Sequence, residues 1–334
     1  MSIALTHRRY KTSYIEDGTE QHPYRIYTVQ DFMDFKNRYN GVNPDGNNDV
    51  HYKLMNDIDL QGYQFINGRA DHNGSFDGNY KVIRNFSLID TVGNFDMGLI
   101  GHSWGGTLPY PAIRRLGLEN VYGNKAAGSS AFSFFIGAMA NQSIEECYVT
   151  GKLDTVTGMT APFCGYMSLN ATIRNCWSNI MINKNNSGGN STGGIVGNIA
   201  YNTGLVDRCL ALGNISSIAS AQGIAGIGGG GSVQNVVTNC VSAMQQLVLS
   251  TGSSAYRIRP ATTTGINNYA LDSMLVNGSV ITNGTTTNQN GANATELQLK
   301  STAFYRDTMG WDMDNIWEIE TEGVTFPRLR GFYK

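Results

Sequence analysis

The sequence predicts an all-β protein, a right-handed parallel β-helix built as a solenoid of repeats about 30 residues long. The first observation is a recurring signature: isoleucine or valine, any residue, usually a polar residue, then an apolar or aromatic residue. Its copies are residues 83–86, 113–116, 144–147, 173–176, 206–209, 237–240 and 266–269. The second observation is a box of small and apolar residues ending in glycine, found at residues 98–101, 134–137, 162–165, 194–197 and 223–226. A fixed period of this length is typical of units that bury their apolar side only against their neighbours.

Each repeat contains three short apolar runs, separated by glycine, asparagine, serine and threonine. The third run follows the signature, as at residues 148–153 and 210–215. Runs of this length between such residues predict strands and turns, and helical periodicity is absent from the sequence between about residue 80 and residue 280. Three strands per turn indicate a parallel β-helix, whose stacked rungs would lie about 4.8 Å apart.

The signature also predicts a bend in the backbone. Ile173 and Cys176 are both apolar but three positions apart, so strict alternation along a strand would place them on opposite faces. A left-handed conformation at Asn175 would turn both side chains inward, and asparagine tolerates that conformation better than most residues. The same conformation, with an amide ladder between stacked rungs, is expected at Asn85, Asn239 and Asn268. This column is interrupted by Arg115, Glu146 and Arg208.

The two ends differ from the repeats and predict caps with short helices and aromatic residues. Residues 24–27 form a predicted strand, and residues 28–31 resemble a capping box that begins a short helix with Phe32 and Phe35 on one face. Residues 295–305 predict another short helix, followed by an aromatic segment. Solenoids need such atypical ends, because an open end exposes apolar core and unpaired strand edges. The chain is therefore divided into an N-terminal arm and cap (1–50), a β-helix (51–285) and a C-terminal cap (286–334).

The cysteines follow the repeat. All but Cys164, which lies in a glycine box, occupy the same position of the signature: Cys147, Cys176, Cys209 and Cys240. An odd count of five with one cysteine per rung does not suggest disulfides, and close pairs typical of a zinc site are missing. We expect a structural ladder of small buried thiols, formed in a reducing cytosol.

Composition limits the partners. The chain has 334 residues, 15% of them charged, and a formal net charge of −2. Nucleic acid and anionic membranes need clustered lysine and arginine, so neither is an expected partner. No run approaches the roughly 20 apolar residues that cross a bilayer, so we expect no membrane insertion. The first residues do not resemble a secretory signal, because the apolar run is short and the basic residues follow it.

Several segments resemble the GLUG-motif repeat proteins of bacterial surfaces. The glycine boxes resemble the GLUG motif itself, and further likeness lies in residues 52–60, 75–88 and 310–319. Such proteins include adhesins and the non-catalytic part of IgA-specific metallopeptidases, and similar repeats occur in phage tail proteins. The resemblance implies a right-handed β-helix used for surface display and binding, and it supplies no catalytic residues.

The acidic residues favour structural roles over catalysis. Hydrolysis of a glycoside would need two carboxylates roughly 5 to 9.5 Å apart across a groove. Asp57 and Asp59 belong to a turn-like segment. Glu145 and Asp207 share a column with Arg84, Arg114 and Arg174, which predicts an ion-pair ladder on the surface. Residues 71–77 could bind calcium through oxygen atoms, but a polar turn is the preferred interpretation. We therefore predict no catalytic residues, no metal and no cofactor.

The residue after each signature should point away from the core. This outer column reads Gly117, Tyr148, Trp177, Leu210, Val241 and Ala270. An exposed apolar stripe usually marks an interface, so we expect a homo-oligomer, for instance a trimer, or a packed neighbouring protein. A sugar-binding platform of Tyr148 and Trp177 is an alternative, and a register that buries the column is another.

These observations lead to three hypotheses of function. The first is a non-enzymatic phage virion component, a tail fibre, spike or appendage, made in the host cytoplasm and displaying a binding surface for the bacterial host. Its partners would be other virion proteins or itself, and a bacterial surface glycan or protein. The alternative is a tailspike-like polysaccharide depolymerase. A weaker alternative is an adhesin located on the bacterial cell surface.

Overall fold

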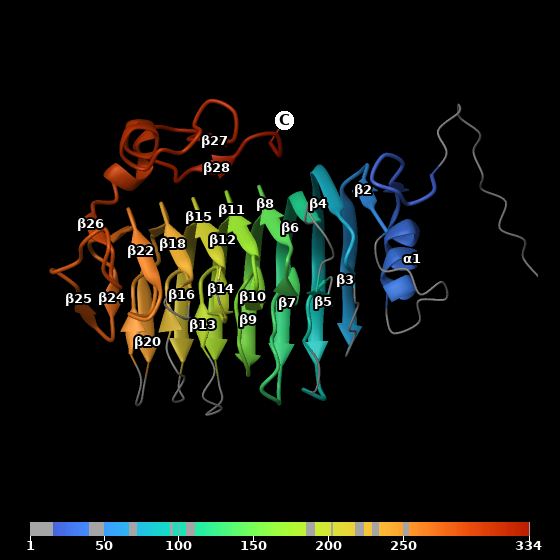
Figure 1. The fold of residues 1–334 in the computed structure, drawn as a ribbon, viewed down its shortest axis with the longest axis horizontal. Coiled ribbons are helices and arrows are strands. Elements are labelled where there is room, and N and C mark those ends of the chain that lie inside the picture. The colour runs from blue at the N-terminus through green and yellow to red at the C-terminus, as the bar shows by residue number, and fades with distance from the viewer. Residues whose placement is uncertain are drawn as a thin grey trace, which may run out of the picture.

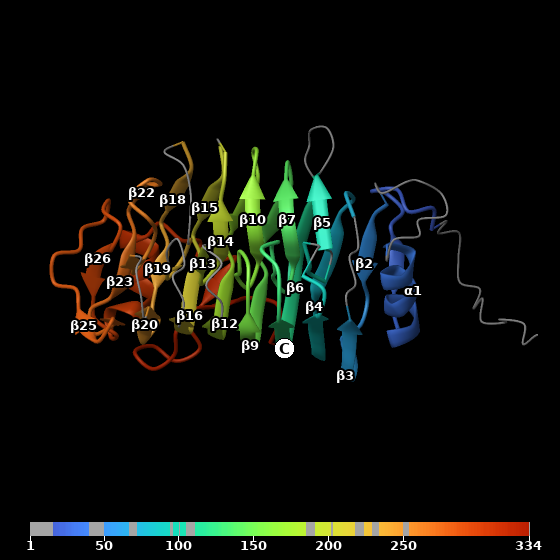
Figure 2. The same cartoon turned by 90° about the horizontal axis from the view of Figure 1, so that it is seen from below.

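The computed structural model describes residues 16–39, 50–66, 72–93, 96–99, 101–104, 111–184, 191–201, 203–217, 224–228, 234–249 and 254–333. Parallel strands wind along one long axis in these residues, and Figures 1 and 2 show the rungs stacked side by side. The predicted all-β parallel β-helix is confirmed. No helix in the described part of the chain is long and apolar enough to span a membrane.

The largest sheet bends around a corner of the solenoid and so covers two of its faces. In chain order its strands are β1 (Tyr24–Ile26), β2 (Tyr52–Leu54), β3 (Ile58–Ile66), β4 (Phe76–Asp90), β6 (Ala112–Lys125), β8 (Ser143–Glu145), β9 (Tyr148–Val156), β11 (Thr172–Arg174), β12 (Trp177–Lys184), β15 (Leu205–Asp207), β16 (Leu210–Ser217), β18 (Val236–Thr238), β19 (Val241–Ser242), β20 (Gln246–Leu249), β22 (Thr264–Ile266), β23 (Tyr269–Leu271), β24 (Leu275–Val276), β25 (Ser279–Val280) and β26 (Ala292–Ala294). β1 pairs with β2, and β26 pairs with β23. The parallel ladder therefore extends beyond the predicted limits of 51 and 285 at both ends.

Two smaller parallel sheets close the solenoid. One holds β5 (Gly101–Trp104), β7 (Ile136–Ala140), β10 (Cys164–Ser168) and β14 (Val196–Ile199). The other holds β13 (Thr192–Gly193), β17 (Ile224–Ala225) and β21 (Ala255–Tyr256). An antiparallel pair, β27 (Trp317–Glu318) and β28 (Arg328–Leu329), lies in the C-terminal segment.

The central signatures stack in register, as predicted. Ile113, Ile144, Ile173, Val206 and Val237 are paired from rung to rung. The first and last copies were assigned wrongly. Phe76 pairs with Ile113, while Ile83 pairs with Leu118, so residues 83–86 belong to a second bend. Gly265 pairs with Val237, so the final copy begins one residue earlier than predicted. The first error arose because the pattern also fits a second bend of β4. The last arose because Gly265 and Asn268 occupy the inward positions, so the apolar pattern matched one residue later, at the exposed Ile266.

The third signature residue takes a left-handed conformation, as predicted for Asn175 and Asn239. This bend, formed by the third signature residue of each rung, is here called the first corner. Its residues with positive φ angles are Arg115 (54°), Glu146 (52°), Asn175 (50°), Arg208 (53°), Asn239 (51°) and Asn267 (51°). Stacking therefore imposes the conformation even on charged residues. Asn267 replaces the predicted Asn268 in this role. Its amide donates to Asn239 Oδ1 at 3.0 Å, which forms a short amide ladder.

The predicted column of thiols is confirmed. Cys147, Cys176, Cys209 and Cys240 are fully buried, and all five cysteines of the chain are free thiols. Each of the four places its sulfur near the backbone of the preceding rung, as Cys176 Sγ does 3.6 Å from the Ile144 carbonyl oxygen. Burial raises the pKa values of Cys176 and Cys240. In the last rung Asn268 takes the cysteine position, which explains why it is buried.

The N-terminal cap forms as predicted. Helix α1 (Val29–Tyr39) begins with the capping box: the Asp31 N–H donates to Thr28 Oγ1 at 3.2 Å, and the Thr28 N–H donates to Asp31 at 2.9 Å. Phe32 and Phe35 are buried, and Phe35 packs against the ring of Tyr52 at 4.8 Å. The helix lies across the end of the solenoid (Figure 1). Residues 1–15 of the predicted arm lie outside the described residues.

The C-terminal segment contains two short turns where one helix was predicted at 295–305. They are η1 (Gln298–Lys300), a 3-10 turn, and η2 (Phe304–Thr308), a π turn. A capping box is present, because the Gln298 N–H donates to Thr295 Oγ1 and the Gln298 side chain accepts from the Thr295 N–H. The segment then turns back and runs along the outside of the solenoid (Figure 1).

Candidate binding site

The outer column is buried, so the prediction that it forms an exposed stripe was wrong. Tyr148 is 1% exposed and Trp177 9%, while Leu210 and Val241 have no exposed surface. The four side chains do share one row, since their strands pair in register. The row continues to Tyr269, not Ala270. The expectation of a homo-oligomer therefore loses the surface on which it was based.

The cover is the chain's own C-terminal segment, residues 304–333, here called the strap. It runs along the outside of the solenoid from the last rungs back toward β4 (Figure 1), where Phe332 packs against Tyr80 at 5.5 Å. Asn267 Nδ2 donates to the Thr308 carbonyl at 3.1 Å, and Trp311 Nε1 donates to the Asn239 carbonyl at 2.9 Å. Farther along, Trp317 Nε1 donates to Asn175 Oδ1 at 3.4 Å. The strap thus crosses one rung after another in reverse order.

The strap also covers Tyr148 and Trp177, the pair predicted as an alternative sugar platform. Tyr148 and Trp177 stack with ring centroids 4.8 Å apart and planes 3° from parallel. Phe332 packs edge-on against Tyr148 at 4.8 Å. The Tyr148 hydroxyl donates to Glu119 at 2.5 Å, and burial together with this carboxylate raises the pKa of Tyr148. The stack is therefore an internal packing element in this structure.

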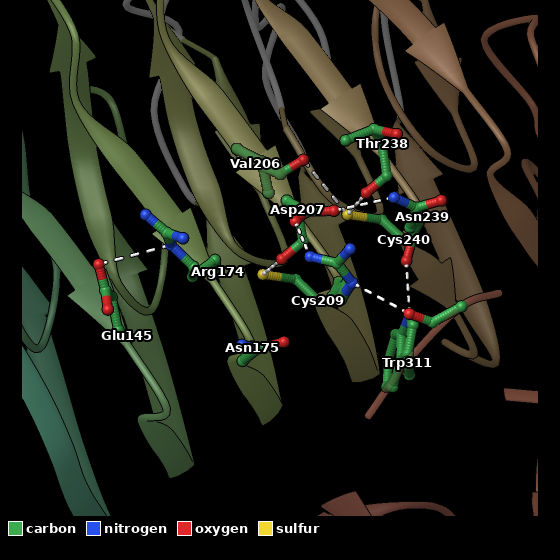
Figure 3. Close-up of polar contacts among 12 residues, drawn as sticks. Glu145, Arg174, Asn175, Val206, Asp207, Cys209, Thr238, Asn239, Cys240 and Trp311 are labelled. Atoms are coloured by element: carbon green, nitrogen blue, oxygen red, sulfur yellow. Dashed lines mark hydrogen bonds and ion pairs between the residues drawn. The ribbon is translucent and has the colours of Figure 1, made fainter. Parts of the chain in front are cut away.

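The predicted row of charges forms in part. Arg174 Nε lies 3.4 Å from Glu145 Oε1, as predicted, and Figure 3 shows this pair beside the first corner. Asp207 pairs instead with Arg208 and accepts from Asn239 Nδ2 at 3.0 Å. Arg84 does not belong to the row, because Asp77 stands opposite Arg114. Arg84 pairs with Asp57 at 3.1 Å on another face.

Asp59 has the turn role that the sequence favoured, whereas Asp57 contacts the next rung. Asp57 accepts from the Val82 N–H at 3.0 Å, which ties one rung to the next. Asp59 accepts from the Gln61 N–H and from Asn85 Nδ2, each at 2.9 Å. The Asn85 amide and the Gln61 N–H stabilise the carboxylate and so lower the pKa of Asp59. Both carboxylates are therefore engaged by hydrogen bonds within the solenoid.

The calcium alternative gains no support. Asp71 lies outside the described residues. Asp77 is paired with Arg114 and Arg115, and His72 is fully buried, which lowers its pKa to about 3. Among the residues that the structure describes, no three acidic, histidine or cysteine side chains gather as a metal site would require.

A shallow groove at the second bend is the best candidate for a binding site. It has a volume of about 520 Å³ and is lined by Asp59, Gln61, Gly62, Asn85, Phe86, Ser87, Asn120 and Tyr122. Asn120 Nδ2 donates to Asn85 Oδ1 at 2.7 Å, and Asn85 Nδ2 donates to Asp59. Asn85 and Asn120 both have positive φ, so the backbone bend itself presents the amides at the surface.

The arrangement suits a hydroxylated ligand. A chain of carboxylate and amide groups fixes the direction of each donor and acceptor, and each amide has a second N–H and each oxygen a second lone pair. Tyr122 adds a ring with a polar tip, an amphipathic side chain of the kind enriched at interfaces. Sequence reasoning missed this site. The sequence held no signal for it, because the copy at 83–86 precedes the next copy by 30 residues, an interval like the others.

The comparisons with known proteins support the fold. No protein-family model and no curated protein matches this sequence. A solved structure does match: a candidate immunoglobulin A1 protease from Bacteroides ovatus, 21% identical, with a TM-score of 0.67 over 94% of each chain. At that identity the likeness shows a shared fold alone. This chain is similar to that protein along almost its whole length.

Proposed function

We propose that this protein is a non-enzymatic display protein whose solenoid presents a glycan-binding groove to a bacterial surface, as a phage tail fibre, spike or appendage would. The observation that carries the proposal is the hydrogen-bonded row Asp59–Asn85–Asn120 in the groove. Sugar hydroxyls both donate and accept, so they match a row of fixed amide and carboxylate groups. A stacked β-structure holds such a row rigidly, which reduces the entropy lost on binding.

The pairing of the acids argues against the depolymerase alternative. Glu145 is occupied by Arg174, and Asp207 by Arg208. Glycoside hydrolysis needs two carboxylates that face each other across a groove, whereas each of these two faces an arginine. We therefore keep binding without cleavage as the proposed activity.

A bacterial cell-surface adhesin is the second candidate for the biological setting. It is favoured by the bacterial source of the solved structure with the same fold. The groove would serve the same purpose in either setting. Gene neighbourhood would distinguish the two, since virion genes lie among other virion genes.

The test is binding to an array of bacterial surface glycans with the groove intact and altered. The double change Asn85→Gly and Asn120→Gly removes both amides while keeping backbones that can adopt positive φ. The control is Asn141→Gly, which has the same conformation, φ 50°, outside the groove. We expect the double variant to lose glycan binding and the control to keep it.

Cleavage is measured in the same samples as newly formed reducing ends or unsaturated uronates. We expect none with any glycan that binds. Release of such products would replace the binding role with a depolymerase. Equal binding by the wild type and the double variant would show that the groove is not the glycan site.

A further inference from the structure

A buried arginine near the C-terminal end of the solenoid has no negatively charged partner. Arg259, which precedes β22, is only 5% exposed. Its Nη1 donates to the Pro260 carbonyl at 2.8 Å, and its Nη2 donates to the Thr287 carbonyl at 2.5 Å. Among the residues that the structure describes, Arg259 makes no ion pair. Its charge is therefore offset only by backbone dipoles.

An arginine cannot escape this cost by losing its proton. Burial lowers the pKa of Arg259, but a guanidinium stays protonated at any physiological pH. A buried charge is costly unless it is both hydrogen-bonded and paired with an opposite charge. Arg257 is the contrasting case, because all three of its guanidinium nitrogens donate hydrogen bonds and the Asp272 carboxylate acts on it. Arg259 lacks both forms of compensation.

The third guanidinium nitrogen of Arg259 is an unused donor beside a glycine. Its Nε is buried and has no hydrogen-bond partner within the described part of the chain. It faces Gly265, since a Cβ atom placed on that residue would lie 2.3 Å from Nε. Gly265 stands in register with Val237, so it occupies the inward position that a valine fills in the preceding rung. The missing side chain therefore admits the guanidinium and leaves no side chain of this residue over its Nε edge.

A second unused donor lies on the same inner face. Thr263 and Gly265 are buried while Thr264 and Ile266 are exposed, so the first two point inward. The Thr263 hydroxyl is also buried, and no described residue hydrogen-bonds to it. The Thr263 N–H and Arg259 Nη1 both donate to the Pro260 carbonyl, at 3.3 and 2.8 Å. A single acceptor can thus reach both residues.

The charge and the two unused donors indicate the same class of ligand. The Nε–H group can only donate, and the hydroxyl can donate as well, so a ligand that accepts twice satisfies both. A water molecule could accept both hydrogen bonds, but it would leave the guanidinium charge uncompensated. An anion does both. Since Arg259 and Thr263 are 5% and 3% exposed, the site is enclosed and suits a small ion.

We propose that Arg259 and Thr263 bind one small monovalent anion, of the class of chloride, beside Gly265. The anion accepts from Arg259 Nε and Thr263 Oγ1 and neutralises the guanidinium. It also secures the segment that follows β25, because Arg259 donates to the Thr287 carbonyl through its side chain and to the Gln289 carbonyl through its N–H at 3.2 Å. This structural ligand of the last rungs is independent of the glycan groove.

The experiment compares chloride with gluconate, an anion too large for an enclosed site. Thermal unfolding of the full chain is followed by circular dichroism while chloride replaces gluconate at constant ionic strength, which keeps the screening of surface charges equal. The variants are Thr263→Val, which removes only the hydroxyl donor, and Arg259→Gln. The matched control is Thr264→Val, a change at the exposed neighbouring threonine. Crystals grown with sodium bromide locate the ion by its anomalous scattering.

We expect the unfolding midpoint of the wild type to rise with chloride and to saturate. A tenfold excess of chloride over its dissociation constant should raise the midpoint by about 2 °C in a chain of this length. The control should respond in the same way. Thr263→Val should need roughly tenfold more chloride, since a hydrogen bond to a charged group is lost, and Arg259→Gln should not respond. A bromide peak should lie next to Arg259 Nε.

Three results would overturn the proposal. They are a wild type whose midpoint shows no saturable response to chloride, a Thr263→Val variant that responds as the wild type does, and bromide crystals without anomalous signal beside Nε, which would mean a water molecule only. If Arg259→Gln does not fold, the bromide crystals and Thr263→Val still decide. Loss of the proposed glycan binding leaves this inference untouched, because no glycan takes part in the chloride response.

Discussion

Replacing Trp317 with alanine should release the strap without unfolding the solenoid. Trp317 is fully buried, its ring lies 4.5 Å from Trp311, and its Nε1 donates to Asn175. Removing a buried tryptophan costs about 3–5 kcal/mol. The β-ladder keeps its own hydrogen bonds, so the loss should weaken strap docking. At about 1.4 kcal/mol per factor of ten, the open strap should become at least a hundredfold more populated.

Limited trypsin digestion measures this opening, because Arg328 and Arg330 lie in the strap and become cleavable when it detaches. Leu297→Ala is the control: this side chain is 69% exposed, so its removal should change stability by no more than about 0.5 kcal/mol. The reasoning is refuted if Trp317→Ala digests at the rate of the wild type. It is equally refuted if the first cuts fall throughout the β-helix, since that would mean the strap and solenoid unfold together.

Three further predictions concern buried charges and thiols. Lys125→Met should lower the free energy of unfolding by about 3–5 kcal/mol in urea titrations, because the buried Asp90 loses its partner; exposed Lys152→Met should change it little. Burial lowers the pKa of Lys36 to about 7, whereas in the unfolded chain it is about 10.4. The unfolded chain therefore holds more protons between these values, so stability should rise with pH from 7 to 10 and rise less in Lys36→Met; a flat or falling profile would contradict this. The thiols of Cys147, Cys176, Cys209 and Cys240 should react with a thiol reagent only at the rate of unfolding, and rapid reaction of the native protein would show that the ladder is open.

The sequence was sufficient to predict the stacking from Ile113 to Val237, because each rung there repeats the same apolar positions and the same bend. The cysteine column followed from that register. Where β4 contains an extra bend, a similar pattern arose at Ile83 for a local reason, and the register was misassigned. An apolar pattern reports that a position is buried somewhere along the backbone, and it does not distinguish one bend from the next.

The cover over the outer column could not be predicted in the same way. The residues at Tyr148 and Trp177 indicate that an apolar surface must meet them. Any such surface would satisfy that need, from another subunit or from the same chain. The contact of Trp317 with Asn175 joins residues 142 positions apart, and no local pattern specifies a pairing at that distance. The row of charges around Glu145 and Arg174 was predictable in part, because both residues occupy the same repeat position. Its N-terminal end was not, because β1 and β2 join the ladder without carrying the signature.

The path of the strap bears on how the molecule unfolds. In an ordinary solenoid each rung touches only its neighbours, so the terminal rungs can fray one at a time. Here the strap joins Asn267 near the last rung to Tyr148 several rungs earlier, in a single continuous run. The last rungs cannot open without disturbing contacts far from the end. A chain with one-dimensional architecture therefore gains a long-range constraint, and its denaturation should approach a single cooperative transition.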